Sequence, residues 1–283
     1  MIAVGVGLAL AAAALHGTWN VLVKVSGDPL ATFRRATLIS AVVATVVLVP
    51  EWLLIGRPHV PATAVALCIL SATLETAYLV LLSIAYRRGQ LSAVYPIARG
   101  SAPLLAVAAG LFLLGEHLSP AQLLGVALLL VGILAVTFSQ AGGRATLPAL
   151  LTGVAIASYT SIDRIGVRLA APWFYGWLLF TLMAVELSLC LWLASKLGLF
   201  LPPSTTSPTW RQSAMIGTFM WAGYLLVLLA LSIAPLAVVA PVRETAVVAV
   251  AVWGVWRLGE RGRAGVKLSG AVATLAGVAL LAV

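Results

Sequence analysis

Two arginines stand at matching places in the sequence, each shortly after a proline. Arg99 follows Pro96, and Arg243 follows Pro241. A guanidinium group stays charged at any relevant pH and can bind a carboxylate through two parallel hydrogen bonds. Tyr95 precedes Arg99 by four residues, so a helix would place both side chains on one face. We therefore expect the two arginines to face a substrate that carries an anionic group.

Ionisable residues recur inside the long apolar segments. They are Glu75, Arg99, Asp163, Arg164, Glu186, Arg243 and Glu244. A charge near the centre of a bilayer costs roughly 2.5–3.5 kcal/mol on insertion scales, so each of these residues needs a partner or a wet cavity. The alternative to substrate binding is a structural network in which Arg99 neutralises Glu75. Arg243 would then neutralise Glu244 or Glu186.

Aromatic residues accompany one of these acids. Tyr78 lies about one helical turn after Glu75, and the corresponding stretch of the second half of the chain holds Trp221 and Tyr224. Aromatic rings beside an acid suit a small organic substrate.

The composition shows what kind of elements must position these side chains. Of the 283 residues, 62% are hydrophobic and 9% are charged, and the mean hydropathy is +1.11. Soluble domains carry about 25% charged residues, so a soluble globular fold is excluded. The net charge of +9 comes mostly from Lys and Arg between apolar segments. Lipid headgroups attract such residues, so the basicity indicates a membrane topology and not a nucleic-acid partner.

Apolar runs bounded by charge, proline or glycine predict ten transmembrane helices. Their approximate ranges are 2–23, 36–56, 62–86, 92–114, 120–138, 147–167, 173–195, 213–233, 236–256 and 266–283. A membrane β-barrel is excluded because its strands alternate over about ten residues, whereas these runs are about twice as long and apolar on all sides. The predicted class is an all-α, multi-pass integral membrane protein.

The two halves of the chain resemble each other. The hexapeptide that ends at Pro96 matches the one that ends at Pro241 at an offset of 145. Gly115-Glu116 matches Gly259-Glu260 at an offset of 144. We infer a first five-helix repeat and a second copy of it.

Five crossings per repeat have a geometric consequence. Because five is odd, the second repeat, 145–283, enters the membrane from the side opposite to the first, 1–140. Two inverted repeats of this kind are typical of secondary transporters, which open a central site to either face by rocking. The predicted lining comes from helices one, three and four and their counterparts six, eight and nine.

The repeat also pairs polar residues on the first and sixth helices. His16 falls opposite Tyr159 at an offset of 143. Asn20 falls opposite Asp163 at the same offset. Either His16 is a packed core histidine, or it lines the cavity with Asn20 and Trp19.

Buried acids are also candidates for proton coupling. A carboxyl group inside the membrane that binds a proton on one face and releases it on the other couples transport to a pH gradient. Asp163 is the first candidate, because its repeat partner Asn20 cannot ionise, and Glu75 is the second. Facilitated exchange without a proton is the alternative.

Glycine stripes mark the fifth and tenth predicted helices. Gly125 and Gly132 lie on one helix, and Gly270 and Gly277 on the other. Small residues let helix backbones approach closely. These two helices are therefore expected to form a scaffold or the surface of a weak homodimer, if the protein is not a monomer, and not to line the cavity.

The chain resembles the drug/metabolite transporter superfamily, in particular the ten-helix proteins built of two EamA-like repeats. The resemblance rests on His16-Gly17-Thr18-Trp19-Asn20-Val21-Leu22-Val23-Lys24, Val94-Tyr95-Pro96-Ile97-Ala98-Arg99-Gly100 and Leu114-Gly115-Glu116, with the counterparts Pro241-Val242-Arg243-Glu244-Thr245 and Leu258-Gly259-Glu260-Arg261. It implies a bacterial inner-membrane exporter of amino acids or other small metabolites that works without ATP and without a cofactor.

Other functions stay open. They are a lipid or lipid-linked-sugar translocator, which would need a lateral opening, and a non-transporting membrane assembly partner. An enzyme is not expected, because the sequence holds no His-Glu-x-x-His, Gly-x-Ser-x-Gly or repeated Asp-rich motif. A metal site is not expected either, because Cys68, Cys190 and His16 have no partners at ligand spacing.

The orientation in the membrane receives two opposite predictions. One face of the predicted topology collects Lys24, Arg34, Arg35, Arg87, Arg88, Arg144, Lys196, Arg211, Arg257, Arg261, Arg263 and Lys267, and the other only Arg57 and Arg168. By the positive-inside rule the first face is cytoplasmic and both termini lie outside. The family resemblance implies that both termini are cytoplasmic.

Overall fold

The protein is described by a computed structural model over residues 1–26, 28–56, 58–88, 91–138, 146–198, 208–246, 248 and 264–282. Within these ranges the secondary structure is helical and includes no strand, which confirms the all-α class. Five helical stretches are long and apolar enough to cross a membrane: Ile2–Val23, Pro29–Ile55, Ala62–Ala85, Pro172–Lys196 and Trp210–Ile233. Shorter apolar helices cover Ala98–Leu113, Pro120–Ala135 and Leu268–Leu281.

The helices follow the predicted segments closely. In chain order they are α1 (Ile2–Val25), α2 (Pro29–Ile55), α3 (Ala62–Arg88), α4 (Leu91–Ala108), the short π-helix η1 (Ala109–Leu113), α5 (Pro120–Phe138), α6 (Thr146–Leu169), α7 (Pro172–Lys196), α8 (Trp210–Ile233), α9 (Leu236–Arg243) and α11 (Ala264–Ala282). The largest differences are the start of α2, which was predicted at residue 36, and the end of α9 at Arg243, inside the predicted segment 236–256. The part of the ninth predicted segment beyond 248 lies outside the described residues.

Helix α2 starts early because its first turn is capped. The carboxylate of Asp28 accepts hydrogen bonds from the backbone N–H groups of Leu30 and Ala31 at 3.1 and 3.2 Å. This satisfies donors that the first turn of a helix leaves free. The helix therefore includes Arg35, whose guanidinium carbon lies 4.9 Å from the ring centre of Trp210. Arg35 lies just outside the segment predicted from apolar runs, and the structure places it inside α2, near the start of the helix.

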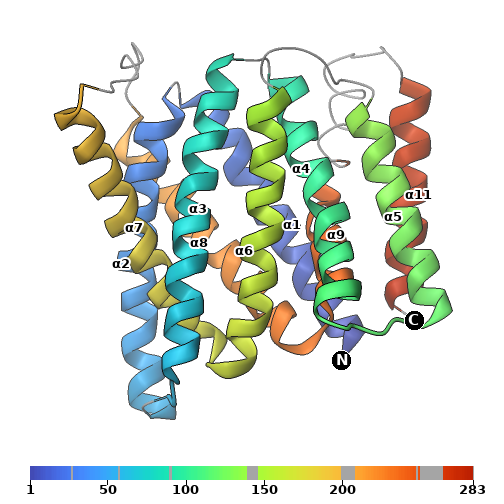
Figure 1. Cartoon of the computed structure of the whole chain (residues 1–283), viewed down its shortest axis with the longest axis horizontal. Helices are drawn as coiled ribbons and strands as arrows, with labels where there is room; N and C mark the ends of the chain where they lie inside the picture. The colour runs from blue at the N-terminus through green and yellow to red at the C-terminus, as the bar shows by residue number, and fades with distance from the viewer. Residues whose placement is uncertain are drawn as a thin grey trace.

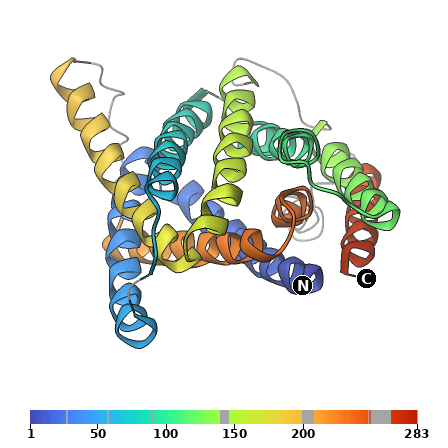
Figure 2. The ribbon, with the colours of Figure 1, turned by 60° about the horizontal axis from the view of Figure 1, so that its bottom comes forward.

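The bundle has two outer edges and a middle. Helices α2 and α7 pack together at one edge, and α5 and α11 pack together at the other (Figures 1 and 2). Between them, α1 packs against α8 and α3 packs against α6. The two ends of the chain lie at the same end of the bundle (Figure 1).

The α5–α11 edge depends on the predicted glycine stripes. A Cβ atom added at Gly125 would lie 3.0 Å from the backbone oxygen of Gly277. One added at Gly277 would lie 2.6 Å from the backbone oxygen of Gly125. The two backbones therefore touch, as the stripes predict.

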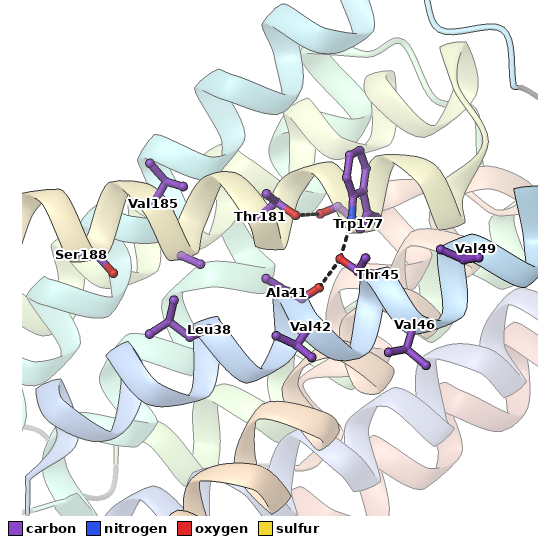
Figure 3. A pocket seen from close by; sticks show the side chains of 11 residues that line it. Leu38, Ala41, Val42, Thr45, Val46, Val49, Trp177, Thr181, Val185 and Ser188 are labelled. Carbon is purple, nitrogen blue, oxygen red and sulfur yellow. Dashed lines mark hydrogen bonds between the residues drawn. The ribbon is translucent and has the colours of Figure 1, made fainter.

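The α2–α7 edge instead holds an apolar groove of about 760 Å³ on the outer surface (Figure 3). Its lining is Leu38, Ala41, Val42, Thr45, Val46, Val49, Trp177, Thr181, Ala184, Val185 and Ser188. The indole N–H of Trp177 donates to the hydroxyl of Thr45 at 3.0 Å, which links α7 to α2. The lining contains no charged side chain.

Candidate functional site

Two arginines and one glutamate meet in the interior of the bundle. Arg99 projects from α4, Arg243 is the last residue of α9, and Glu244 follows it. None of the three is more than 3% exposed. One carboxylate oxygen of Glu244, Oε1, accepts a hydrogen bond from Nη1 of Arg99 at 3.2 Å. The same oxygen lies 3.1 and 3.0 Å from Nε and Nη2 of Arg243. We call these three residues the arginine centre.

The two prolines act differently on the helices that carry the arginines. Helix α4 continues through Pro96, which removes a backbone donor without ending the helix. Helix α9 ends two residues after Pro241, so Arg243 stands at a helix terminus. All eight residues of α9 are buried, and α9 packs beside α4. Arg243 therefore stands at a helix terminus, whereas Arg99 stands inside a continuous helix.

Arg99 and Arg243 have different neighbours besides Glu244. Nη2 of Arg99 donates to the hydroxyl of Tyr78 at 2.8 Å. Its guanidinium carbon also lies 5.7 Å from the ring centre of Tyr78 and 5.9 Å from that of Trp19, within cation–π range. Nη1 of Arg243 is buried and has no hydrogen-bond partner. The arginine centre thus retains a donor that a ligand could use.

A second cluster of polar residues surrounds Asp163 on α6. The Asp163 side chain is fully buried. Oδ1 of Asp163 accepts from the hydroxyl of Tyr175 at 2.9 Å, and Oδ2 accepts from the hydroxyl of Tyr224. Tyr175 lies on α7 and Tyr224 on α8, so one carboxylate joins three helices. We call these three residues the aspartate centre.

The aspartate centre needs a glycine on α6. A Cβ atom added at Gly166 would lie 2.6 Å from the hydroxyl oxygen of Tyr175. A Cβ atom does not approach another heavy atom that closely. The absence of a side chain at Gly166 is therefore what lets Tyr175 reach Asp163.

A row of tyrosine rings connects the two centres. The ring of Tyr78 lies 5.9 Å from that of Tyr159, which lies 6.0 Å from that of Tyr224. The first of these tyrosines contacts Arg99 and the last contacts Asp163. The residues come from α3, α6 and α8.

Glu75 belongs to the same interior. It lies one turn before Tyr78 on α3, is 5% exposed, and its Oε1 atom is buried without a hydrogen-bond partner. The charges of Asp163, Arg243 and Arg99 all act on it. Where the structural alternative pairs Arg99 with Glu75, the structure pairs Arg99 with Glu244. Arg243 pairs with Glu244, as that alternative has it.

Helix α1 contributes an aromatic and an imidazole ring. His16 and Trp19 pack with ring centres 5.0 Å apart, and the Nδ1 atom of His16 and Nε1 of Trp19 are buried without partners. Asn20 donates its amide to the backbone oxygen of His16 at 2.7 Å. The amide N–H of Asn20 is thus engaged within its own helix.

Two further predicted site residues, Trp221 and Tyr95, have no described hydrogen bond to either centre. Trp221 is partly buried on α8, three residues before Tyr224, and its Nε1 atom has no partner. Tyr95 lies in α4, but its side chain is outside the described residues. The remaining predicted positions all fall on α1, α3, α4, α6, α8 and α9 or, for Glu244, directly after α9.

Tyr175 was not predicted from the sequence as part of the site. It lies on α7, twelve residues after Asp163, and no repeat or motif points to it. The available signal was the short connection between α6 and α7, which brings the start of α7 beside the end of α6.

The sequence analysis also missed the role of Glu116. Its carboxylate accepts from the backbone N–H groups of Leu236 and Ala237 at 2.7 and 2.9 Å, at the start of α9. Arg164 Nε lies 3.1 Å from the same carboxylate. A carboxylate at a helix N-terminus is favourable. Glu116 of the first half therefore fixes the helix that carries Arg243.

Gly115 explains why the motif is a Gly-Glu pair. Its φ of +64° lies in the left-handed region, where a side chain is disfavoured. The chain turns there after η1 and brings Glu116 to α9. Glu260, which matches Glu116 in the second half, lies outside the described residues.

Metal binding receives no support from the described ranges, in which no three His, Cys, Asp or Glu side chains come together as a metal site would require.

The fold and these buried centres define a multi-pass helical membrane protein with a polar interior. Residues 3–138 match the EamA-like transporter family. A crystal structure described only as that of a protein superposes with a TM-score of 0.73 and 17% identity, over 98% of this chain and 95% of that one, and so shares the fold. No curated protein matches the sequence. The first half of the chain is therefore similar to EamA-like transporters.

Proposed function

We propose that the protein is a secondary transporter that exports small metabolites across the bacterial inner membrane. Transport proceeds by alternating access between two inverted repeats, 1–140 and 145–283. Amino acids are the substrate class to test first, because each carries a carboxylate that a guanidinium can bind.

The proposal rests chiefly on the arginine centre. Arg99 comes from the first half and Arg243 from the second, so a ligand bound to both would contact both halves. The buried, unpartnered Nη1 atom of Arg243 is a donor that a substrate carboxylate would satisfy. A site shared by two moving halves is what alternating access requires.

The arrangement of helices supports the inverted repeat. Helix α1 packs against α8, and its counterpart α6 packs against α3, the counterpart of α8. Helices α1 and α6 also run in opposite directions through the bundle (Figure 1). Both relations are expected when the second half enters from the other side.

We assign substrate contact to the predicted set and proton coupling to its two central acids. The substrate set is His16, Trp19, Asn20, Glu75, Tyr78, Tyr95, Arg99, Tyr159, Asp163, Trp221, Tyr224, Arg243 and Glu244. Asp163 is the first proton carrier proposed, and Glu75 is the second.

The test is efflux from proteoliposomes that contain the purified protein. A panel of labelled amino acids and drug-like cations is measured with and without a pH gradient. Efflux of carboxylate-bearing compounds above that from empty liposomes supports the proposal. Movement of fluorescent lipids instead supports a lipid translocator, for which the α2–α7 groove is the relevant lateral feature. If no compound or lipid moves, these substrate classes are excluded and the assembly-partner alternative is favoured.

A further inference from the structure

Glu244 has no acidic counterpart in the first half of the chain. At the offset of 144 that relates Arg243 to Arg99, it falls opposite Gly100. One carboxylate therefore faces two guanidinium groups, and both pair with it. By formal charge, the arginine centre carries two positive charges and one negative charge.

The net positive charge of the arginine centre is buried, so water screens it little. The side chains of Arg99, Arg243 and Glu244 are 1%, 1% and 4% exposed. The interaction between charges strengthens as the surrounding dielectric constant falls. One more negative charge at the Nη1 donor of Arg243 would satisfy that donor and balance the formal charge of these three residues.

We propose that Glu244 is a specificity-determining residue that limits the site to one substrate carboxylate. It gathers both guanidinium groups on one oxygen and cancels one of their charges, and the substrate cancels the other. A dicarboxylate bound at the arginine centre would add two negative charges, one more than the centre needs. An uncharged amide would add none. The inference rests on the proposed function, because it assumes that the arginine centre binds the substrate.

Two other buried acids, Asp163 and Glu75, lie near the arginine centre and are kept unchanged in the test of Glu244. Both oxygens of Asp163 already accept tyrosine hydroxyl groups, and Tyr159 lies between those tyrosines and the arginine centre. Glu75, on which the charges of Arg243 and Arg99 act, is left unaltered in every variant. A series of variants within that centre therefore isolates its own charge.

The experiment measures binding of three probes of equal chain length to purified protein in lipid nanodiscs at constant ionic strength. The probes are butyrate with one charge, succinate with two, and butyramide with none. Binding is followed by the shift in melting temperature with probe concentration. The wild-type protein should bind butyrate at least tenfold more tightly than succinate or butyramide.

Variants then change the formal charge of the centre in single steps. Glu244→Gln raises it to +2 and should reverse the preference, so that succinate binds at least tenfold more tightly than butyrate. Arg99→Gln lowers it to zero and should abolish binding of both anions. The double variant Arg99→Gln/Glu244→Gln returns it to +1 and should recover the preference for butyrate.

Glu186→Gln is the matched control, because Glu186 also lies within a long apolar helix but bonds to the Thr73 hydroxyl on α3. It should keep the wild-type preference. The inference is overturned if Glu244→Gln, or the double variant should the single one not fold, shows a preference that does not follow the formal charge. If neither anion binds to the wild-type protein, the carboxylate site of the proposed function is itself wrong.

Discussion

The arginine centre and the aspartate centre place buried charge in opposite ways. In the first, two cations share one oxygen of Glu244, and a donor of Arg243 is left over. In the second, one carboxylate receives a neutral hydroxyl group on each oxygen, from Tyr175 and Tyr224. The first centre is incomplete in charge and in hydrogen bonds, whereas the second has both carboxylate oxygens bonded.

This difference indicates which of the two centres has a group free to bind a ligand. An unsatisfied buried donor costs free energy that a bound carboxylate would recover. A carboxylate with both oxygens bonded to tyrosines of two other helices offers less to a ligand and more to helix packing. Within the proposed site, the comparison favours the arginine centre for binding the substrate carboxylate and Asp163 for a structural or proton-carrying role.

The largest effect is expected from breaking the arginine centre. Arg243→Ala or Arg99→Ala should lower the transport rate of a carboxylate-bearing substrate about 100-fold, because a charge-assisted hydrogen bond is worth about 1.5–3 kcal/mol. Glu244 keeps one arginine partner in either variant, so the folded yield should stay near that of the wild type. Efflux from proteoliposomes and the melting temperature check the two halves of this prediction.

A structural role for the arginines would give a different pattern. Both variants would aggregate or melt many degrees lower, and the loss of transport would follow from the loss of folded protein.

The next effect concerns the packing that builds the aspartate centre. Gly166→Ala should push Tyr175 away from Asp163 and destabilise the protein by about 2 kcal/mol, as overpacking does. Gly7→Ala on α1 is the control, because a Cβ atom there meets nothing within 4 Å. Equal melting temperatures for the two variants would show that Tyr175 does not need the space at Gly166.

A third effect separates proton coupling from binding. Asp163→Asn keeps the shape but removes the charge change, so accumulation driven by a pH gradient should stop while substrate exchange continues. For one proton per substrate the accumulation ratio that is lost is about tenfold per pH unit. Measuring flux across imposed gradients checks this, and Glu75→Gln is the parallel variant.

A wild-type flux that does not depend on the gradient would remove the proton-carrier role from both acids. The protein would then be a facilitator or an exchanger.

The smallest effect is expected from single hydroxyl groups. Tyr175→Phe and Tyr224→Phe should each lower the stability by about 1 kcal/mol, because each removes one hydrogen bond to Asp163 and keeps the ring. Tyr78→Phe, which removes a hydroxyl from the arginine centre, should instead weaken substrate binding. Chemical denaturation and binding measurements on the three variants separate the two centres.

Most helices were predictable from the sequence because crossing a membrane requires long apolar runs. The start of α2 was predicted too late because the cap provided by Asp28 extends the helix beyond its apolar run. The pairing of Arg99 with Glu244 was not predictable. The two residues are 145 positions apart, and only the packing of α4 beside α9 brings them together. Tyr175 was missed for a similar reason, since its contact with Asp163 depends on the space at Gly166.

The most direct test of the account compares an acid with its amide. The amino acid that the wild-type protein transports fastest, and the amide of the same amino acid, are measured for binding to the wild-type protein and to Arg243→Ala. The account predicts that the wild type binds the acid at least about tenfold more tightly, because the amide lacks the charge that the guanidinium recognises. Arg243→Ala should bind the two compounds equally. A preference for the acid that survives in Arg243→Ala, or no preference in the wild type, would contradict the assignment of the substrate carboxylate to the arginine centre.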